Sequence, residues 1–218
     1  MKKMTSALLM ILLVFAAVCR AETDASAAAF QAADAAQGGH ILIAYFSAME
    51  TDGVDTVASA SRVAKDGALL SNNQYIAQII RRETDGELFA IETVQDYPGT
   101  HAPLLAFGHD EQAAGTKPEL ATHIEDVDRY DVVYLGFPIW NADFPMPIYS
   151  FLDEYDFSGK TIVPFTTHGG SDFAGTIETI AELEPNATVI RSGLSVYRSD
   201  VPNADEAVVR WLNGLNLE

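Results

Sequence analysis

Short apolar segments alternate with longer amphipathic segments along residues 40–217. The short segments are rich in the branched and aromatic residues that favour β-strands, and they cover 41–46, 88–94, 132–137, 161–166 and 188–196. The longer segments have helical character and cover 73–83, part of 118–127, 147–155, 174–183 and 204–215. Near-continuous apolar strands that alternate with helices predict an α/β fold, in which helices cover both faces of a mostly parallel sheet.

The N-terminal residues have the pattern of a secretory signal. A cationic start at Lys2 and Lys3 runs into an apolar stretch at 7–18, which is too short to cross a bilayer and ends in small residues. This pattern predicts a signal peptide over residues 1–21 with cleavage after Ala21. We therefore expect an exported protein, periplasmic or extracellular, with no membrane span.

Cys19 offers an alternative to cleavage after the signal, because a lipid could be attached to it. Lipoprotein processing favours a small residue before the cysteine, whereas Val18 is branched and bulkier. Residues 22–39 are rich in alanine and end in two glycines, which predicts a flexible tether. The remaining residues, 40–218, have the length of one domain with one sizeable core.

Charge and cysteine content restrict the partners and the chemistry. The formal net charge is -18, and loss of residues 1–21 would remove three cations and no acid, which gives -21. So acidic a protein is a poor partner for nucleic acid and for anionic membranes. Without Cys19 no thiol remains, and the histidines are too irregularly spaced to suggest a metal site. Chemistry must then come from oxygen and nitrogen groups or from a bound cofactor.

The third predicted strand ends in a segment suited to a flat ligand. It continues as Pro138, Ile139, Trp140 and Asn141, and further aromatic and proline residues follow. Aromatic rings on a chain stiffened by prolines predict a rigid apolar wall. The alternative is that the indole of Trp140 caps the core.

The fourth predicted strand ends in Thr167, His168, Gly169 and Gly170. In a parallel sheet this end lies on the same edge as the end of the third strand. Paired glycines allow close approach of the backbone, and hydroxyls with free amides suit the polar edge of a ring such as a flavin pyrimidine. An ordinary glycine turn is the alternative, and His168 is either a donor to a ligand or a solvent-facing side chain.

The first predicted strand ends near Ser47 and leads into about twenty polar and small residues, an unusual length for a loop in a compact domain. Ser71, Asn72 and Asn73 then open a helix. Serine and asparagine cap helices, and the free amides of a helix start attract anions. The segment therefore predicts either simple capping or a phosphate site.

Together these motifs resemble the flavodoxin-like family, in particular its flavodoxin-type proteins with a PIW segment after strand three and a TxGGS segment after strand four. The matching stretches are ILIAYFS (41–47), YDVVYLGFPIW (130–140), FLDEYDFSGKTIVPFTTHGGS (151–171) and a final helix. The resemblance implies a flavodoxin-like three-layer sandwich with a five-stranded parallel sheet in the order 2-1-3-4-5.

The resemblance also implies FMN as the cofactor. Its phosphate would be bound by Ser47, Ser71, Asn72 and Asn73, one ring face would be covered by Pro138, Ile139 and Trp140, and the polar edge would contact Thr167, His168, Gly169 and Gly170. The long loop after Ser47 splits the compact phosphate motif of the family. Asn141 stands at a site position where the family has a second aromatic residue.

We therefore expect an exported FMN-binding protein for electron transfer, whose partner is a redox protein or a small electron acceptor. Because an acidic surface and an apolar wall disfavour the anionic reduced flavin, we expect a low potential for the last electron. One alternative is an FMN-dependent quinone-type reductase, whose acceptor would enter beside Asn141. Another is a cofactor-free flavodoxin-shaped binding protein, which would use the loop at 50–70 for contacts.

Overall fold

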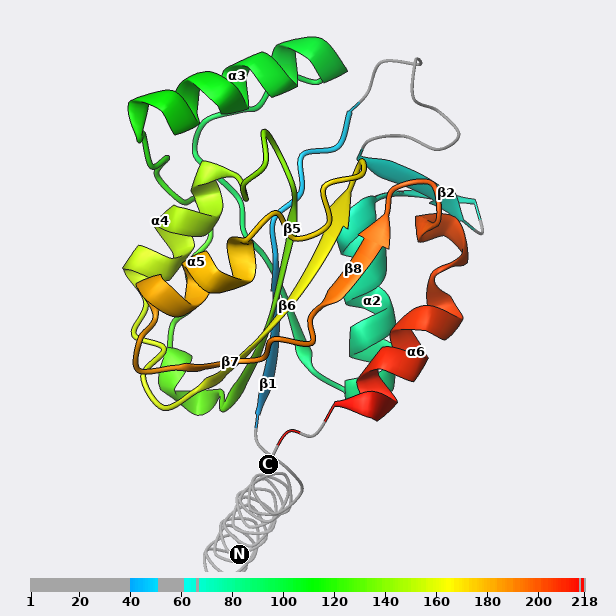
Figure 1. Ribbon diagram of the computed structural model, residues 1–218, viewed down its shortest axis with the longest axis vertical. Helices are drawn as coiled ribbons and strands as arrows, with labels where there is room; N and C mark the ends of the chain where they lie inside the picture. The colour runs from blue at the N-terminus through cyan, green and yellow to red at the C-terminus, as the bar shows by residue number, and fades with distance from the viewer. Residues whose placement is uncertain (1–39, 51–60, 66, 216, 218) are drawn as a thin grey trace, which may run out of the picture. The chain divides into compact units, whose positions relative to one another are not determined.

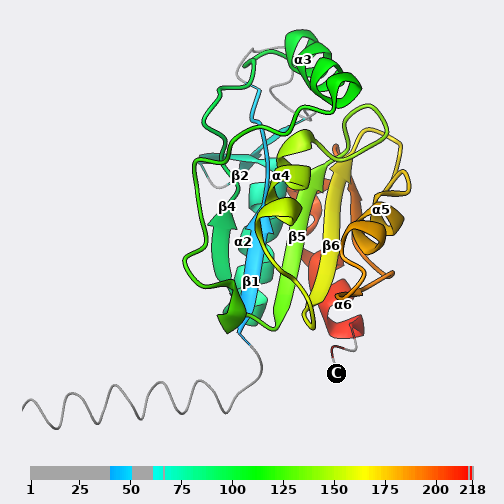
Figure 2. The ribbon, with the colours of Figure 1, turned by 90° about the vertical axis from the view of Figure 1, so that its left-hand side faces the viewer.

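The computed structural model describes residues 40–50, 61–65, 67–215 and 217. Within these residues, all strands of the main sheet are parallel, in the order β4-β1-β5-β6-β7, and β8 also pairs with β6. Their bounds are β1 (Ile41–Tyr45), β4 (Glu87–Ala90), β5 (Val132–Pro138), β6 (Thr161–His168), β7 (Thr188–Val189) and β8 (Leu194–Tyr197). The predicted order 2-1-3-4-5 is confirmed, and its first four strands, β4-β1-β5-β6, can be followed in Figure 2. The fifth place is shared by β7 and β8, which both pair with β6 (Figure 1).

Helices cover both faces of this sheet, so the three-layer arrangement is confirmed. Helices α4 (Met146–Glu154) and α5 (Thr176–Leu183) lie on one face, and α2 (Asn72–Thr84) and α6 (Asp205–Gly214) lie on the other (Figure 1). Helix α3 (His101–Ala114) lies beyond the carboxyl ends of the strands. None of the helices in the described residues is long and apolar enough to cross a membrane.

The sheet separates two apolar cores, and β1 contributes to both. Leu42 and Ala44 face the core under α4, whereas Ile43 faces the core under α2. All three side chains are fully buried, which explains why this strand is a continuous apolar run rather than an alternating one. The burial of both faces fixes the strand at the centre of the domain.

The predicted helix within residues 118–127 is wrong. The chain is extended there, with a bridge between Thr93 and Leu120, and only a short 3-10 turn follows at Val127–Arg129. The helix of this crossover is α3 instead, which buries only Leu104, Gly108 and Glu111. A helix with one apolar side chain among its buried residues lacks the 3.6-residue period that sequence patterns reveal.

The loop expected at 50–70 ends in a hairpin that the pattern did not predict. Strands β2 (Arg62–Lys65) and β3 (Ala68–Ser71) pair antiparallel and lead directly into α2. Lys65 Nζ donates to the carbonyl of Pro202 at 2.8 Å and lies 3.2 Å from Asp205 Oδ2. The hairpin is thereby attached to the start of α6, while residues 51–60 of the expected loop lie outside the described residues.

The predicted strand 188–196 is interrupted, and Pro164 explains the interruption. Ile190 N donates to the carbonyl of Ile162 at 2.9 Å, and the next bond of a parallel ladder would come from residue 164. Proline has no N–H, so the ladder stops and resumes only at the pair Phe165 and Leu194. The fifth place in the sheet is therefore filled by β7 and β8 in succession.

Candidate functional site

A cavity of about 300 Å³ lies at the carboxyl edge of the sheet. That volume is at the lower end of the range for ligand pockets, and the edge is where α/β proteins bind ligands. Seven of the residues predicted to form the site line it: Pro138, Ile139, Trp140, Asn141, Thr167, His168 and Gly169. The segments after β5 and β6 therefore meet at one cavity, as the sequence predicted for a ring site.

The other predicted site residues do not line this cavity. Ser47 lines a second hollow, whose wall is more polar than that of the cavity and also includes Tyr97 and Pro98. Ser71, Asn72 and Asn73 are buried at the start of α2, on the same sheet edge. Gly170 lies on the turn after β6, but its amide donates to His168 Nδ1 at 2.9 Å rather than remaining free.

The segment after β5 is held open by a tight turn. Trp140 and Asp143 exchange two backbone hydrogen bonds, of 2.8 and 3.0 Å, around Asn141 and Ala142. Both central residues have positive φ, 50° and 64°. Such a two-residue turn prefers asparagine or glycine, so alanine at the second position is strained. The turn places Asn141 and Ala142 on the cavity wall.

The indole of Trp140 belongs largely to the core. Its side chain is only 6% exposed and makes edge-to-face contacts with Phe46 and Tyr97, at centroid distances of 5.8 and 5.7 Å. Gly108 of α3 packs against the same ring. The alternative that Trp140 caps the core is thus realised, while one part of the residue still lines the cavity.

Gln112 fixes α3 over this aromatic segment. Its side-chain amide donates to the carbonyls of Trp140 at 3.1 Å and Phe144 at 3.4 Å. Asn141 reaches the carbonyl of Leu105 at the longer distance of 3.5 Å. Helix α3 is therefore a structural cover for the cavity wall as well as a source of lining residues.

His168 has a defined protonation form. Its Nδ1 accepts hydrogen bonds from the amides of Gly170 and Asp172, at 2.9 and 3.1 Å. A ring nitrogen that accepts carries no proton, so the neutral ring carries its proton on Nε2. Burial lowers the pKa of His168, while the charge of Asp172 acts in the opposite direction. The side chain therefore offers one N–H donor at the cavity.

A carboxylate–imidazole pair forms another part of the cavity wall. Glu50 Oε1 lies 2.6 Å from His101 Nδ1, and the Glu50 side chain is 1% exposed. The backbone of Glu50 is held at both ends, because its amide donates to Ser61 Oγ and its carbonyl accepts from Arg62. A carboxylate that accepts from Nδ1–H leaves Nε2 of His101 as the group that can exchange a proton with a ligand.

Buried polar atoms without partners gather at the start of α2 and the end of β6. Neither Oδ1 nor Nδ2 of Asn73 has a hydrogen bond in the described residues, and the side chain is fully buried. The Thr167 hydroxyl is likewise without a partner in that part of the chain. The first amide of α2 is not free, because Asn72 N donates to the carbonyl of Ser61 at 2.9 Å. Such groups are costly unless a ligand or water satisfies them.

Seven lining residues were missed by the sequence analysis: Glu50, Ser61, His101, Leu105, Ala142, Ser171 and Arg198. His101 and Leu105 belong to the unpredicted α3. Arg198 could have been found, because it lies two residues after the last predicted strand, 188–196, and strand ends of a parallel sheet meet at one edge. No group of three or more metal-ligating side chains occurs among the residues that the structure describes.

Comparison with known proteins agrees with this architecture. Residues 108–214 match the family model Flavodoxin_4, described as flavodoxin. No curated protein sequence matches the chain. Among solved structures, a candidate flavoprotein from Bacteroides eggerthii DSM 20697 is similar with a TM-score of 0.60 and 22% identity, over 83% of this chain and 100% of that one.

Two further solved structures are similar at comparable levels. A candidate flavoprotein from Bacteroides uniformis ATCC 8492 has a TM-score of 0.60 and 23% identity, over 81% of this chain and 99% of that one. A flavoprotein from Lactobacillus acidophilus NCFM, solved in complex with FMN, has a TM-score of 0.55 and 20% identity, over 80% and 99%. These similarities establish the flavodoxin-like fold.

Proposed function

We propose that this flavodoxin-like chain, which matches the flavodoxin family model over residues 108–214, binds FMN at the carboxyl edge of its sheet and uses it for electron transfer. The observation that carries the proposal is the cavity of about 300 Å³ that is lined by the segments after both β5 and β6. A similar flavoprotein from Lactobacillus acidophilus was solved with FMN, which supports the choice of cofactor.

The residues present fit a phosphorylated flavin. Pro138 and Ile139 supply an apolar wall for the ring, and Gly169 lets the backbone come close to its polar edge. The cavity alone is near the small end for a ligand of this size, so the phosphate has to lie beyond it. The side-chain amide of Asn73, which has no partner in the described residues, would donate to a phosphate oxygen if the flavin displaces the groups that bury it.

When bound, FMN supplies the redox chemistry, and the protein supplies binding, orientation and electrostatics. Pro138 and Ile139 exclude water from one side of the ring. The N–H of His168 Nε2 is available as a donor to the ring edge, because Nδ1 is occupied by two backbone amides. Binding and orientation therefore come from different segments of the same sheet edge.

Export and partner choice are further parts of the proposal. The signal-like pattern of residues 1–21 supports an exported protein, although those residues lie outside the described part of the chain. A net charge of -18 supports a basic redox protein as partner, or a small electron acceptor. Acidic surfaces raise the encounter rate with basic partners more than they raise affinity.

The pair of Glu50 and His101 favours a second candidate function, an FMN-dependent quinone-type reductase. Two-electron reduction of a quinone requires protons, which a pure electron carrier does not have to deliver. A buried carboxylate 2.6 Å from an imidazole on the cavity wall is suited to delivering them. The same pair gives no support to the third reading, a cofactor-free binding protein.

Absorption spectroscopy of the purified full chain, alone and with added FMN, tests the proposal. Bound FMN is expected to give a flavin spectrum that stays with the protein through gel filtration and a fluorescence lower than that of free FMN. A colourless protein that leaves the fluorescence of added FMN unchanged would refute FMN binding and favour a cofactor-free binding protein.

A further inference from the structure

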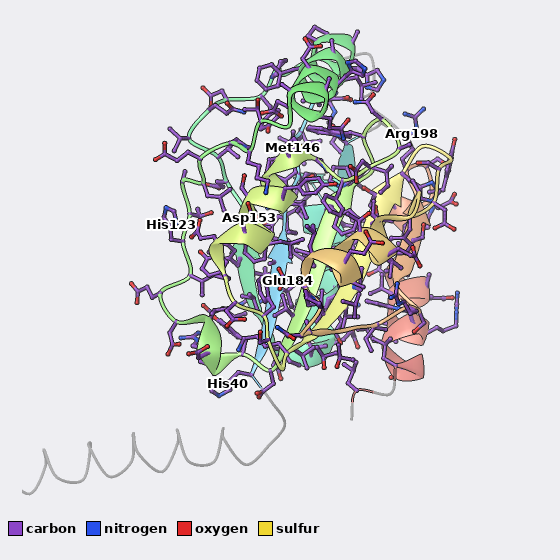
Figure 3. All side chains as sticks on the ribbon, turned by 60° about the vertical axis from the view of Figure 1, so that its left-hand side comes forward. His40, His123, Met146, Asp153, Glu184 and Arg198 are labelled. Atoms are coloured by element: carbon purple, nitrogen blue, oxygen red, sulfur yellow. The ribbon has the colours of Figure 1, made fainter. Side chains whose placement is uncertain are left out.

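Arg198 stands over the turn where the polar edge of the flavin is expected. A Cβ placed on Gly169 would lie 3.7 Å from both Cζ and Nη1 of the Arg198 guanidinium. The arginine follows β8, and its amide donates to the carbonyl of His168 at 2.9 Å, which fixes its backbone beside β6. Figure 3 shows Arg198 at the carboxyl edge of the sheet, at the opposite end of the domain from His40.

Arg198 has no ion-pair partner within 4.0 Å among the described residues. Other arginines of the domain do have one, such as Arg191 with Glu178 at 3.2 Å. In a chain with 31 acids and 13 cations, a cation that lines a cavity without a paired carboxylate is a notable arrangement. It places a positive charge on the Gly169 side of the cavity, whereas the carboxylate of Glu50, which lines the same cavity, is hydrogen-bonded to His101.

We propose that Arg198 stabilises the negative charge of the reduced flavin, and that it thereby raises the flavin's two-electron potential above the value set by the acidic surface. The inference rests on the proposed FMN site. Two-electron reduction adds two electrons and one proton, at N5, and leaves one negative charge shared by N1 and the carbonyl oxygen at C2. The guanidinium near Gly169 lies on the side of the cavity where this polar edge would contact the backbone.

The effect of a charge on the flavin potential depends on its distance from the flavin, which favours Arg198 over the surface carboxylates. Exposed charges farther than about 8–10 Å are largely screened at physiological salt, whereas a partly buried cation in contact with the ligand is screened much less. The overall charge of -18 therefore has less effect on the flavin than the single guanidinium on the cavity wall. Two carboxylates act against Arg198: Glu50 lines the same cavity, and Asp172 lies on the turn after β6. Asp172 forms no ion pair with Arg198 within 4.0 Å in the described residues.

A higher two-electron potential changes the kind of redox chemistry that the site favours. It stabilises the fully reduced flavin, which suits transfer of an electron pair to an acceptor such as a quinone. The low-potential carrier expected from sequence alone would need the opposite. A raised two-electron potential therefore favours a reductase, and this effect does not depend on proton delivery by Glu50 and His101.

Spectroelectrochemical titration of the FMN-loaded full chain, equilibrated with an indicator dye, tests the proposal. Arg198→Gln is expected to weaken the preference for reduced over oxidised flavin at least tenfold, which lowers the midpoint by about 30 mV for a two-electron couple. Arg198→Lys, which keeps the charge, is expected to retain most of the wild-type potential. The control Arg191→Gln removes the same charge from an exposed site and should leave the potential unchanged.

FMN binding is measured first, by fluorescence quenching, for the wild type and each variant. Loss of binding by the wild type would overturn the proposed function itself. If FMN binds but Arg198→Gln has the potential of the Arg191→Gln control, the role of Arg198 is refuted while the flavin site stands. If Arg198→Lys falls as far as Arg198→Gln, the charge is not the cause and the inference is equally refuted.

Discussion

Gly108 of α3 lies against the indole of Trp140, so that a Cβ on this glycine would come within 2.8 Å of Trp140 Cε3. No real Cβ approaches a ring carbon so closely without a shift of the helix or the ring. The absence of a side chain at Gly108 therefore sets how deeply α3 sits over the aromatic segment after β5. Through this contact, α3, a helix that sequence patterns did not predict, packs against the wall of the cavity.

Gly108→Ala is expected to lower the free energy of unfolding. Overpacking costs about 1–3 kcal/mol, and the better helix propensity of alanine offsets about 1 kcal/mol of it. Urea denaturation followed by circular dichroism measures the net loss, which we expect to be about 1 kcal/mol. Gly214→Ala, at the end of α6 with nothing within 4 Å of its Cβ, serves as control and should not destabilise. Equal stability of the two variants would contradict the close packing.

Ala142→Gly is expected to stabilise the protein. Alanine at φ 64° pays the cost of a left-handed backbone, about 1–2 kcal/mol, which glycine does not. Because glycine has more freedom in the unfolded chain, the net gain should be about 0.5–1 kcal/mol in thermal or urea unfolding. Ala113→Gly, at an exposed position of α3, should instead lose about 1 kcal/mol. A loss at both positions would argue against the strained turn.

His101→Gln tests the second candidate function. If the pair of Glu50 and His101 delivers protons to an acceptor, turnover of a quinone with a chemical reductant should fall by about 10²–10⁴-fold, and its dependence on pH should flatten. Steady-state rates across pH 5 to 9 measure both. His109→Gln removes an exposed histidine from the same helix and should keep the wild-type profile. Identical profiles for the two variants would assign the pair a structural role only.

Glu184 makes stability depend on pH. Burial, together with the charges of Asp156 and Asp153, raises the pKa of Glu184 to about 7 (Figure 3 shows Glu184 and Asp153). The folded state then binds more protons than the unfolded state between about pH 4.5 and 7, so this group's contribution to stability falls as the pH rises through that window. Above pH 7 the loss is complete.

Glu184→Gln removes this penalty, so the variant should be more stable than the wild type at pH 8 and similar to it at pH 4.5. The gain should be on the order of 1 kcal/mol, since the side chain is only partly buried and solvent screens it. Thermal unfolding at both pH values measures it. Glu182→Gln, which changes an exposed acid on α5, is the control for net charge. A gain at pH 4.5 as large as at pH 8 would contradict the account.

Sequence patterns predicted the sheet and the helix layers on its two faces, because strands such as β1 and β6 are apolar on both faces and contain branched residues. They failed at α3, where Gly108 and the buried Glu111 occupy positions that a pattern expects to be apolar. Burial of Glu111 depends on hydrogen bonds from Gln95 and Tyr97, which come from a distant segment. No local pattern contains that information.

The cavity residues after β5 and β6 were predicted better than the other residues that line the cavity. Residues 138–141 and 167–169 lie at the carboxyl ends of β5 and β6. These strands are parallel neighbours, so the topology of the sheet alone brings the two segments together. Glu50 and His101 meet only through tertiary packing of α3 against the segment after β1. The start of α2, predicted to hold a phosphate, lies at the carboxyl edge of the sheet (Figure 1), but the burial of Asn73 could not be derived from its position at a helix start.

Parallel fluorescence titrations of the cofactor-free full chain with FMN and with riboflavin test whether the carboxyl edge of the sheet binds a phosphorylated flavin. We expect saturable quenching by both, at one ligand per chain, with FMN bound at least tenfold more tightly because buried polar groups such as Asn73 are satisfied by its phosphate. Equal affinity for the two flavins would contradict the phosphate site, and no quenching by either would contradict the flavin site as a whole.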